Sequence, residues 1–311
     1  MKIAVLFPGY GSQYVGMAKE LYDTSRTVQE FFEEAAHCLD KNFVKLCFAS
    51  SDVEISKLEN ALLANFLVSS ALYSVLKEQV DLRPSVTAGY GFGGFAALFS
   101  AGGLNFPDGL YLINKYIAFF HESFPHLDKV AVHVSGFDLE ALQQVIDEVN
   151  EGTYIAAFET DKDHVVIVPS DSLGHLKYLL KEHGIKKIKP FPDIEGLHSA
   201  DMEPVVSQLM LYSEKVDFKD LQIPLLASCD TRIVTDKGDI KDAMRRHMLF
   251  PLQWYSALLS LHDYDLFIEI GPGTVLSEQI KNLYPNKQVI SINTLDDIDR
   301  AKSIFELKHT V

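Results

Sequence analysis

The sequence predicts an α/β fold, in which a doubly wound, mostly parallel sheet carries a small inserted α+β subdomain. Apolar segments at residues 2–7 and 266–270 run into Pro-Gly and Gly-Pro-Gly loops, as buried strands do. Helical periodicity separates these segments, and strands that alternate with helices favour a parallel sheet. Between residues 126 and 195 the order becomes strand, helix, strand, strand, helix, strand, which is the order of the ferredoxin-like unit.

The first 125 residues show the alternation of strands and helices most clearly. Apolar residues in 27–39 recur at i, i+3 and i+4, which is typical of an amphipathic helix. The strand at 85–89 breaks at a glycine-rich turn, residues 89–94, before a helix resumes. The expected elements are a strand at 2–7, a loop at 9–13, a helix beginning at 15–21, helices at 27–39 and 60–79, a strand at 85–89, and helices at 95–101 and 106–120.

The remaining elements divide the chain into a host domain and an insertion. We expect inserted strands at 129–134, 154–158, 165–168 and 185–191, with helices at 138–149 and 172–183. After them we expect helices at 200–214, 238–247 and 251–262, strands at 225–228, 266–270 and 289–292, and a helix that opens at the Gly-Pro-Gly of 271–273. The prediction is therefore a large domain over 1–125 and 196–311, and an inserted subdomain over 126–195.

Composition excludes several classes of function. With 28 Lys and Arg against 43 Asp and Glu, the formal net charge is −15, which disfavours binding to nucleic acid or to anionic membranes. No segment reaches the roughly 18 apolar residues of a membrane span, and we expect a cytoplasmic protein. Three cysteines without C-x-x-C spacing, and histidines without H-E-x-x-H, predict no disulfide, metal or cofactor.

The turn at residues 89–93 occupies the place of a nucleophile elbow, G-x-S-x-G. Such an elbow holds a serine between a strand and a helix, but its centre here is Gly91, which has no side chain to acylate.

Gly89, Gly91 and Gly94 also satisfy the dinucleotide-binding motif G-x-G-x-x-G. The motif comes late in the chain, and Asp108, about 20 residues on, opens an expected helix instead of ending a strand, so nucleotide binding is disfavoured.

Five segments of the sequence resemble those of the malonyl-CoA:acyl carrier protein transacylase family, and they occur in the family's order. They are FPGYGSQ at 7–13, GYGFGG at 89–94, LHSADM at 197–202, PLQW at 251–254 and EIGPGTVL at 269–276. They have the family's spacing over nearly the whole chain. The resemblance implies an acyltransferase or acyl hydrolase-like fold that includes the inserted subdomain. It also implies a chemistry in which histidine activates serine, and the acyl-serine passes its acyl group to a carrier-protein thiol.

Most of the family's chemical groups are replaced in this chain. On the alignment, Gly91 stands at the serine, Tyr90 at the histidine before it, Gly94 at the closing glutamate, Tyr10 at the loop glutamine, Tyr116 at the carboxylate-binding arginine with Lys115 adjacent, and Phe158-Glu159-Thr160 at an N-x-N segment. Tyr10, Tyr90, Phe92 and Tyr116 are expected to fill part of the substrate pocket. The family histidine remains as His198, and His247 is expected to orient it through its backbone carbonyl.

These departures predict a degenerate transacylase of fatty-acid or polyketide synthesis. It would lack serine acyl-enzyme chemistry and bind acyl carrier protein, an acyl group or acyl-CoA, or a synthase partner. One alternative is an active acyltransferase or thioester hydrolase in which His198 activates water or a thiol without an acyl-serine. Another is a structural subunit of an active acyltransferase. Ser199 and Tyr90 are disfavoured as substitute nucleophiles, because Ser199 adjoins His198 and a tyrosine with a pKa near 10 needs strong activation.

Basic residues form two clusters in this acidic chain. Lys186, Lys187 and Lys189 form one, and Arg245 and Arg246 form the other. Charged clusters of this kind are commonly solvated surface. The functional alternative is a docking site for an acidic carrier protein beside the cleft.

Overall fold

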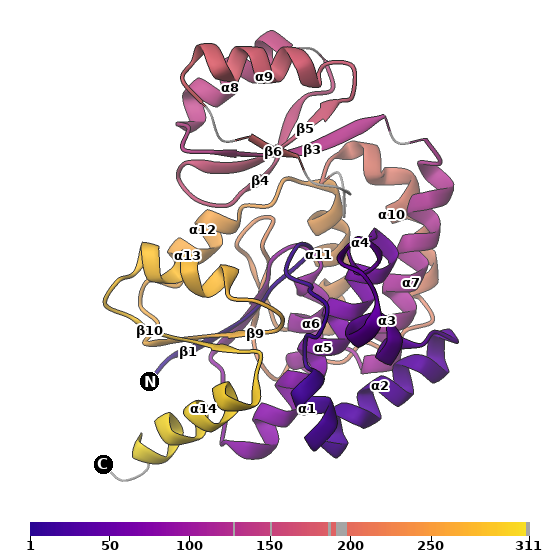
Figure 1. The fold of residues 1–311 in the computed structure, drawn as a ribbon, viewed down its shortest axis with the longest axis vertical. Helices are drawn as coiled ribbons and strands as arrows, with labels where there is room; N and C mark the ends of the chain where they lie inside the picture. Colours follow the sequence, from indigo (N-terminus) through magenta and orange to yellow (C-terminus); the bar gives the residue numbers. More distant parts are fainter. Residues whose placement is uncertain (127, 150, 186–187, 191–197, 309–311) are drawn as a thin grey trace.

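The computed structural model describes residues 1–126, 128–149, 151–185, 188–190 and 198–308, and it contains two sheets (Figure 1). The larger sheet has six strands in the order β10-β9-β1-β2-β7-β8. They are β1 (Ile3–Phe7), β2 (Val86–Gly89), β7 (Leu225–Leu226), β8 (Ile233–Val234), β9 (Leu266–Ile270) and β10 (Gln288–Ile292). All pairs are parallel except β7 with β8, so the predicted mostly parallel sheet is confirmed.

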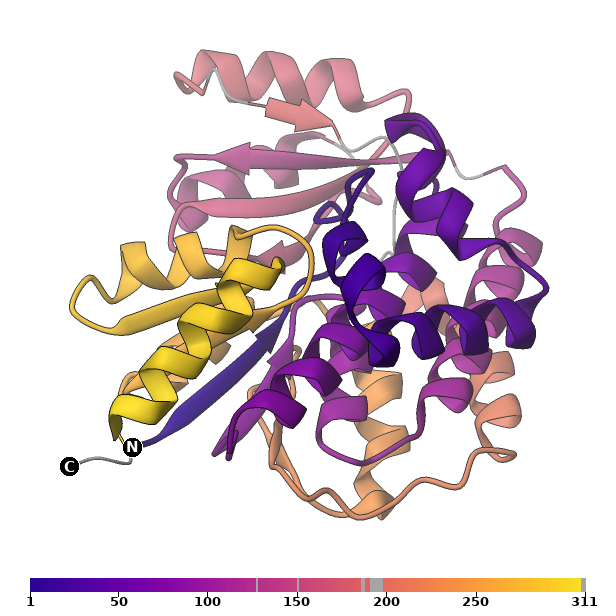
Figure 2. The same cartoon turned by 60° about the horizontal axis from the view of Figure 1, so that its bottom comes forward.

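Helices cover both faces of the larger sheet, as a doubly wound fold requires. The helices of this part of the fold are α1 (Lys19–Thr24), α2 (Arg26–Leu39), α3 (Phe43–Ala49), α4 (Asp52–Ile55), α5 (Leu58–Gln79), α6 (Gly93–Ser100), α7 (Phe106–Ser123), η1 (Ala200–Met202), α10 (Glu203–Ser213), α11 (Lys237–Leu249), α12 (Trp254–Ser260), α13 (Val275–Leu283) and α14 (Leu295–Lys308). Figure 2 shows β1 running between the C-terminal helices and the N-terminal ones.

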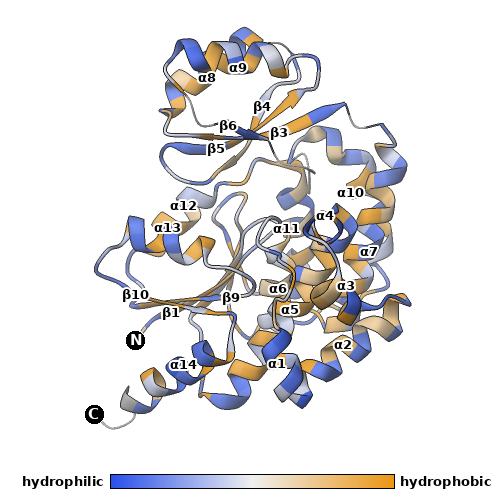
Figure 3. Ribbon diagram, in the orientation of Figure 1, coloured by the Kyte–Doolittle hydropathy of each residue, from blue (hydrophilic) through white to orange (hydrophobic). Residues whose placement is uncertain are grey.

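Alternate residues of β1 belong to two different apolar cores. Val5 and Phe7 belong to the core that α2, α5, α6 and α7 share, whereas Leu6 belongs to the core that includes residues of α12 and α13. This alternation follows from the two-residue period of a strand. In Figure 3 the hydrophobic colouring gathers on α5 and α6, which lie inside, while α14 is largely hydrophilic. The carboxyl ends of β1 and β2 therefore lie side by side over a solid core.

The second sheet has the strand order of the ferredoxin-like unit. It contains β3 (Lys129–Ser135), β4 (Tyr154–Phe158), β5 (Asp163–Pro169) and β6 (Ile188–Pro190), with antiparallel pairing in the order β4-β5-β3-β6. Helices α8 (Leu139–Val149) and α9 (Leu173–Glu182) cover the face turned away from the larger sheet (Figure 1). This sheet lies within the segment 126–195 that we expect to be inserted. The exact division into domains stays a prediction.

Backbone hydrogen bonds join the second sheet to the rest of the molecule. The amide of Phe158 donates to the carbonyl of Leu252 (2.9 Å), and the amide of Leu252 donates to the carbonyl of Ala156 (2.8 Å). This pairing explains why α12 begins at Trp254, three residues later than the helix predicted from Pro251. The sequence also failed to predict α3, α4, β8 and α14. Among the described residues, no helix is both long and apolar enough to cross a membrane.

Candidate functional site

The elbow between β2 and α6 is built of backbone and lies against the loop that follows β1. The amide of Tyr90 donates to the carbonyl of Phe7 (3.0 Å), and the amide of Gly94 donates to the carbonyl of Gly91 (3.0 Å). Gly91 has a φ of 52°, in the left-handed region that glycine adopts most readily. A Cβ on Gly93 would overlap the carbonyl oxygen of Phe7. The close approach of these two loops therefore requires glycine.

His198 has the contact that the alignment predicts. Its side chain is buried, and Nδ1 lies 2.9 Å from the backbone carbonyl oxygen of His247. Because a carbonyl oxygen only accepts hydrogen bonds, Nδ1 carries the proton of the neutral ring and Nε2 is the basic nitrogen. The arrangement suits a general base.

The imidazole of His247 lies behind the elbow. Its Nδ1 is 3.1 Å from Ser228 Oγ, and its Cε1 is 4.0 Å from the place that a Cβ on Gly94 would occupy. Burial, helped by the nearby His198, lowers the pKa of His247 to about 3. The ring is therefore neutral at physiological pH and borders the space beside Gly94.

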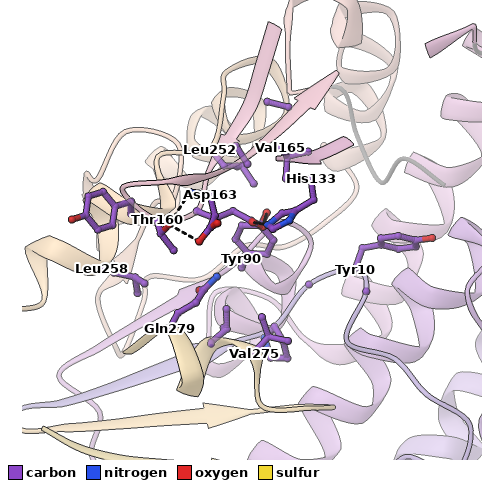
Figure 4. A pocket seen from close by; sticks show the side chains of 18 of the residues that line it. Tyr10, Tyr90, His133, Thr160, Asp163, Val165, Leu252, Leu258, Val275 and Gln279 are labelled. Carbon is purple, nitrogen blue, oxygen red and sulfur yellow. Dashed lines mark hydrogen bonds and ion pairs between the residues drawn. The ribbon is translucent and has the colours of Figure 1, made fainter. Parts of the chain in front are cut away.

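A cleft of about 790 Å³ lies between the two sheets (Figure 4). Its walls include apolar side chains from both parts of the fold, among them Val165, Leu252, Leu258 and Val275. The polar groups that line it include Tyr10, Tyr90, His133, Glu159, Asp163, Lys189 and His198. A largely apolar concavity with a few convergent polar groups is the usual form of a small-molecule site.

A chain of hydrogen bonds crosses this cleft between Tyr90, Glu159 and His133. Tyr90 Oη donates to Glu159 Oε1 (2.5 Å), and His133 Nε2 lies 2.8 Å from Glu159 Oε2. The bond to Glu159 raises the pKa of His133, although burial opposes this effect. In Figure 4, Tyr90 and His133 point toward one another within the cleft. We call this set the Tyr90–Glu159–His133 relay.

The sequence did not predict the relay. The sequence identifies Glu159 only as a replacement in the N-x-N segment, and its motifs give no indication of a role for His133. The alternation of side chains along β3 is the feature of the sequence that could indicate a role for His133. His133 lies on the same face as Ala131, which also lines the cleft. Without the strand pairing, nothing in the sequence indicates that this face meets Tyr90.

The residues expected in the substrate pocket do not all line this cleft, and His247, like three others, is not among its described lining residues. Tyr10 and Tyr90 line the cleft, but Phe92, Tyr116 and Lys115 are not among the described residues that do so. Phe92 and the fully buried Tyr116 pack together in the core, with ring centroids 4.4 Å apart. Lys115 Nζ lies 4.9 Å from the ring centroid of Tyr212 on α10. The Lys115 ammonium therefore lies against α10 and is not part of the cleft wall.

The basic clusters are partly neutralised in the described residues. Arg245 pairs with Glu203 at 3.0 Å, and Arg246 pairs with Asp230 at 2.8 Å. Lys189 lines the cleft. Lys186 and Lys187 lie outside the described residues.

Among the residues that the structure describes, no cluster of three or more His, Cys, Asp or Glu could hold a metal ion.

Comparison with known proteins identifies the family. The acyl transferase domain model matches residues 5–305. The malonyl CoA-acyl carrier protein transacylase of Bacillus subtilis is 31% identical over 305 residues, which cover 96% of both chains. An acyl carrier protein S-malonyltransferase from Vibrio cholerae is 26% identical, with a TM-score of 0.88 over 96% of this chain and 99% of that one.

The malonyl-CoA:acyl carrier protein transacylase of Helicobacter pylori is also 26% identical. Its structure superposes with a TM-score of 0.91 over 98% of this chain and 99% of that one. The sheet order, the elbow and the His198–His247 contact lie in segments that the family model covers. This chain therefore belongs to the acyl transferase domain family.

Proposed function

We propose that this chain is a degenerate, cytoplasmic relative of malonyl-CoA:acyl carrier protein transacylases that binds acyl carrier protein or its acyl thioester. It lacks serine acyl-enzyme chemistry and serves fatty-acid or polyketide synthesis. The observation that carries this proposal is Gly91 at the centre of the elbow, in a molecule whose His198 still contacts the carbonyl of His247. The histidine that would act as base is present, but Gly91, at the position of the serine nucleophile, has no side chain.

Loss of the cation at position 116 supports loss of malonyl transfer. A malonyl carboxylate needs a charge-assisted partner, and a planar arginine fork is best suited to it. Tyr116 is fully buried against Phe92, so this position offers an aromatic contact in place of a charge. We infer that the cleft takes thioesters through their apolar parts, without selecting a distal carboxylate.

Carrier protein is the proposed partner because the named relatives act on it. The proposed contact surface comprises Lys189 at the cleft and Arg245 and Arg246 on α11, together with Lys186 and Lys187, which precede Lys189 in the sequence. The two arginines already pair with Glu203 and Asp230, so docking there replaces existing ion pairs. The same surface would serve a synthase or acyltransferase partner, which is the structural-subunit alternative.

The test combines a binding measurement with mapping of acyl groups. The protein is titrated with holo carrier protein and with acetyl-CoA and malonyl-CoA, then digested and analysed by mass spectrometry. We expect binding and no acylated serine. The matched control is Gly91→Ser, which returns a hydroxyl to the elbow beside His198 and is expected to gain an acyl group there from acetyl-CoA. Acylation of a serine in the unchanged chain would contradict the proposal. A protein that binds neither the carrier protein nor the CoA thioesters would contradict it as well.

A second candidate function is thioester hydrolysis or direct transfer with His198 as the base. The bond from Nδ1 to the carbonyl of His247 supports it, since it leaves Nε2 to accept a proton from water or from a carrier thiol. This function predicts CoA release without a change in protein mass. Release should be lost in His198→Ala, and release that persists in that variant excludes His198 as the base.

A further inference from the structure

We propose that Tyr90 is a nucleophile that accepts an acyl group from a thioester, with Glu159 as its base and His133 as the proton donor to the leaving thiol. The inference goes beyond the proposed binding function and depends on it only for entry of the thioester into the cleft. It names an acyl acceptor on the elbow, one residue before Gly91, in a chain that has no side chain at the expected position.

The geometry of the relay is that of an activated nucleophile. Such sites place a nucleophile within hydrogen-bond reach of a base, which a third group orients. Tyr90 Oη is 2.5 Å from one oxygen of Glu159, and His133 Nε2 is 2.8 Å from the other. Ser135 Oγ lies 3.0 Å from His133 Nδ1 and orients the ring from its other side. All three members of the relay line the 790 Å³ cleft.

Each member is held in place by contacts outside the relay. The ring of Tyr90 packs edge-on against Trp254, with centroids 5.6 Å apart. The amide of Glu159 donates to the carbonyl of Asp163 (3.0 Å), directly after the backbone pairing that joins Phe158 to Leu252. That backbone pairing already attaches the second sheet to the larger one. The relay is therefore not required to attach the second sheet to the larger one. The short hydrogen bond between Tyr90 and Glu159 is available for chemistry.

Tyrosine is a weak nucleophile because the phenol is protonated at neutral pH. A carboxylate that accepts the phenolic proton removes this obstacle, as a general base does for other hydroxyl nucleophiles. Glu159 is 9% exposed and has Tyr90 and His133 as hydrogen-bond partners. The bond to Glu159 raises the pKa of His133 and so favours its protonated form, which can then supply a proton.

The reaction is balanced within the relay. Tyr90 Oη attacks the thioester carbonyl carbon as its proton passes to Glu159, and the C–S bond breaks. The leaving thiolate takes a proton from protonated His133. The proton on Glu159 then passes to His133, which restores the ion pair. The products are an aryl ester on Tyr90 and a free thiol. Aryl esters are reactive, so attack by a second thiol can remove the acyl group.

The test is peptide mapping after incubation with acetyl-CoA or octanoyl-CoA. We expect one acyl group on the peptide that contains Tyr90, removable by neutral hydroxylamine as an ester is. Tyr90→Phe, which keeps the ring against Trp254, should lose this label entirely. Glu159→Gln retains an oxygen that accepts the phenolic hydrogen bond, and should slow labelling by about a hundredfold through loss of the base.

The control variant is Tyr178→Phe, because Tyr178 is 59% exposed on α9 and would report non-specific acylation. Its substitution should leave the Tyr90 label unchanged. An acyl-CoA that binds without labelling Tyr90, or a label that survives in Tyr90→Phe, overturns the inference. If neither acyl-CoA nor holo carrier protein binds, the proposed function fails instead. Labelling with p-nitrophenyl acetate, a small activated ester, then decides the role of Tyr90 independently.

Discussion

The histidines show that surroundings, more than residue type, set chemistry at the residue scale. Burial lowers the pKa of His247 to about 3, and burial also lowers the pKa of His164. The pKa of His133 is raised instead, because Glu159 accepts a hydrogen bond from it. His198 has its Nδ1 directed at a carbonyl oxygen. One residue type thus supplies a permanently neutral ring, a proton donor and a candidate base in one molecule.

His164 predicts how stability depends on pH. Its side chain is 1% exposed, and burial lowers its pKa below the ordinary 6.5, although Asp163 and Glu159 oppose the shift. The unfolded chain therefore binds this proton more readily. The contribution of His164 to stability is complete above about pH 6.5 and is lost as the pH falls, by at most about 1.4 kcal/mol per pH unit.

Urea denaturation at a series of pH values checks this prediction. His164→Phe keeps a ring of similar size next to Phe158 and removes the titrating group. The variant should show a smaller loss of unfolding free energy between about pH 7 and pH 5 than the unchanged chain. Equal slopes in the two proteins would assign the acid sensitivity to other groups.

At the scale of elements, the site depends on where helices begin after strands. α6 begins at Gly93, two residues before the predicted start at Phe95, and Gly93 lies against the carbonyl of Phe7. α13 begins after the Gly-Pro-Gly loop as predicted. Its first amides, those of Leu276 and Ser277, donate to the buried carboxylate of Glu269 at 3.1 and 2.8 Å. The carboxylate thus holds one wall of the cleft on the end of β9.

Glu269→Ala should therefore destabilise the molecule. The substitution leaves two buried amides without their acceptor, which costs about 2 kcal/mol or more in unfolding free energy. The measurement is urea denaturation at neutral pH. Glu278→Ala is the control, because Glu278 is an exposed residue of the same helix and its loss should change stability by less than about 0.5 kcal/mol. Similar effects from the two substitutions would contradict this role for Glu269.

At the scale of the whole molecule, the negative net charge of the chain opposes binding of the proposed partner, acyl carrier protein. The chain has a net charge of −15, and carrier proteins are usually acidic as well, so the two repel at long range. Attraction must come from local basic groups. Arg245 and Arg246 are already paired with acidic side chains, so we expect the lysine cluster of Lys186, Lys187 and Lys189 to supply the larger share of this attraction.

Charge reversal tests this docking surface. Combined Lys186→Glu, Lys187→Glu, Arg245→Glu and Arg246→Glu should weaken carrier binding by about tenfold at low salt, because attraction becomes repulsion. Isothermal titration with holo carrier protein measures the change. The control is Lys302→Glu on α14, on the opposite side of the molecule from the second sheet (Figure 1). Unchanged carrier binding in the fourfold variant would remove this surface from the proposal.

The sequence by itself determined the fold class, the strand–turn–helix at the elbow and the absence of a serine there. These features follow from local periodicity, from glycines at sharp turns and from the identity of one residue, Gly91. It did not predict α3 or α14. It also placed Phe92 and Tyr116 in the substrate pocket, because alignment supplies position without side-chain direction.

Only the tertiary structure brought Tyr90, Glu159 and His133 together. They belong to the elbow, to the loop after β4 and to β3, and 69 residues of chain separate Tyr90 from Glu159. Local patterns carry no information on a contact of this length, since it depends on how the second sheet pairs with Leu252. The same long-range packing directs Lys115 toward Tyr212 and pairs Arg245 with Glu203. The polar chemistry of the cleft is thus a property of the assembled fold.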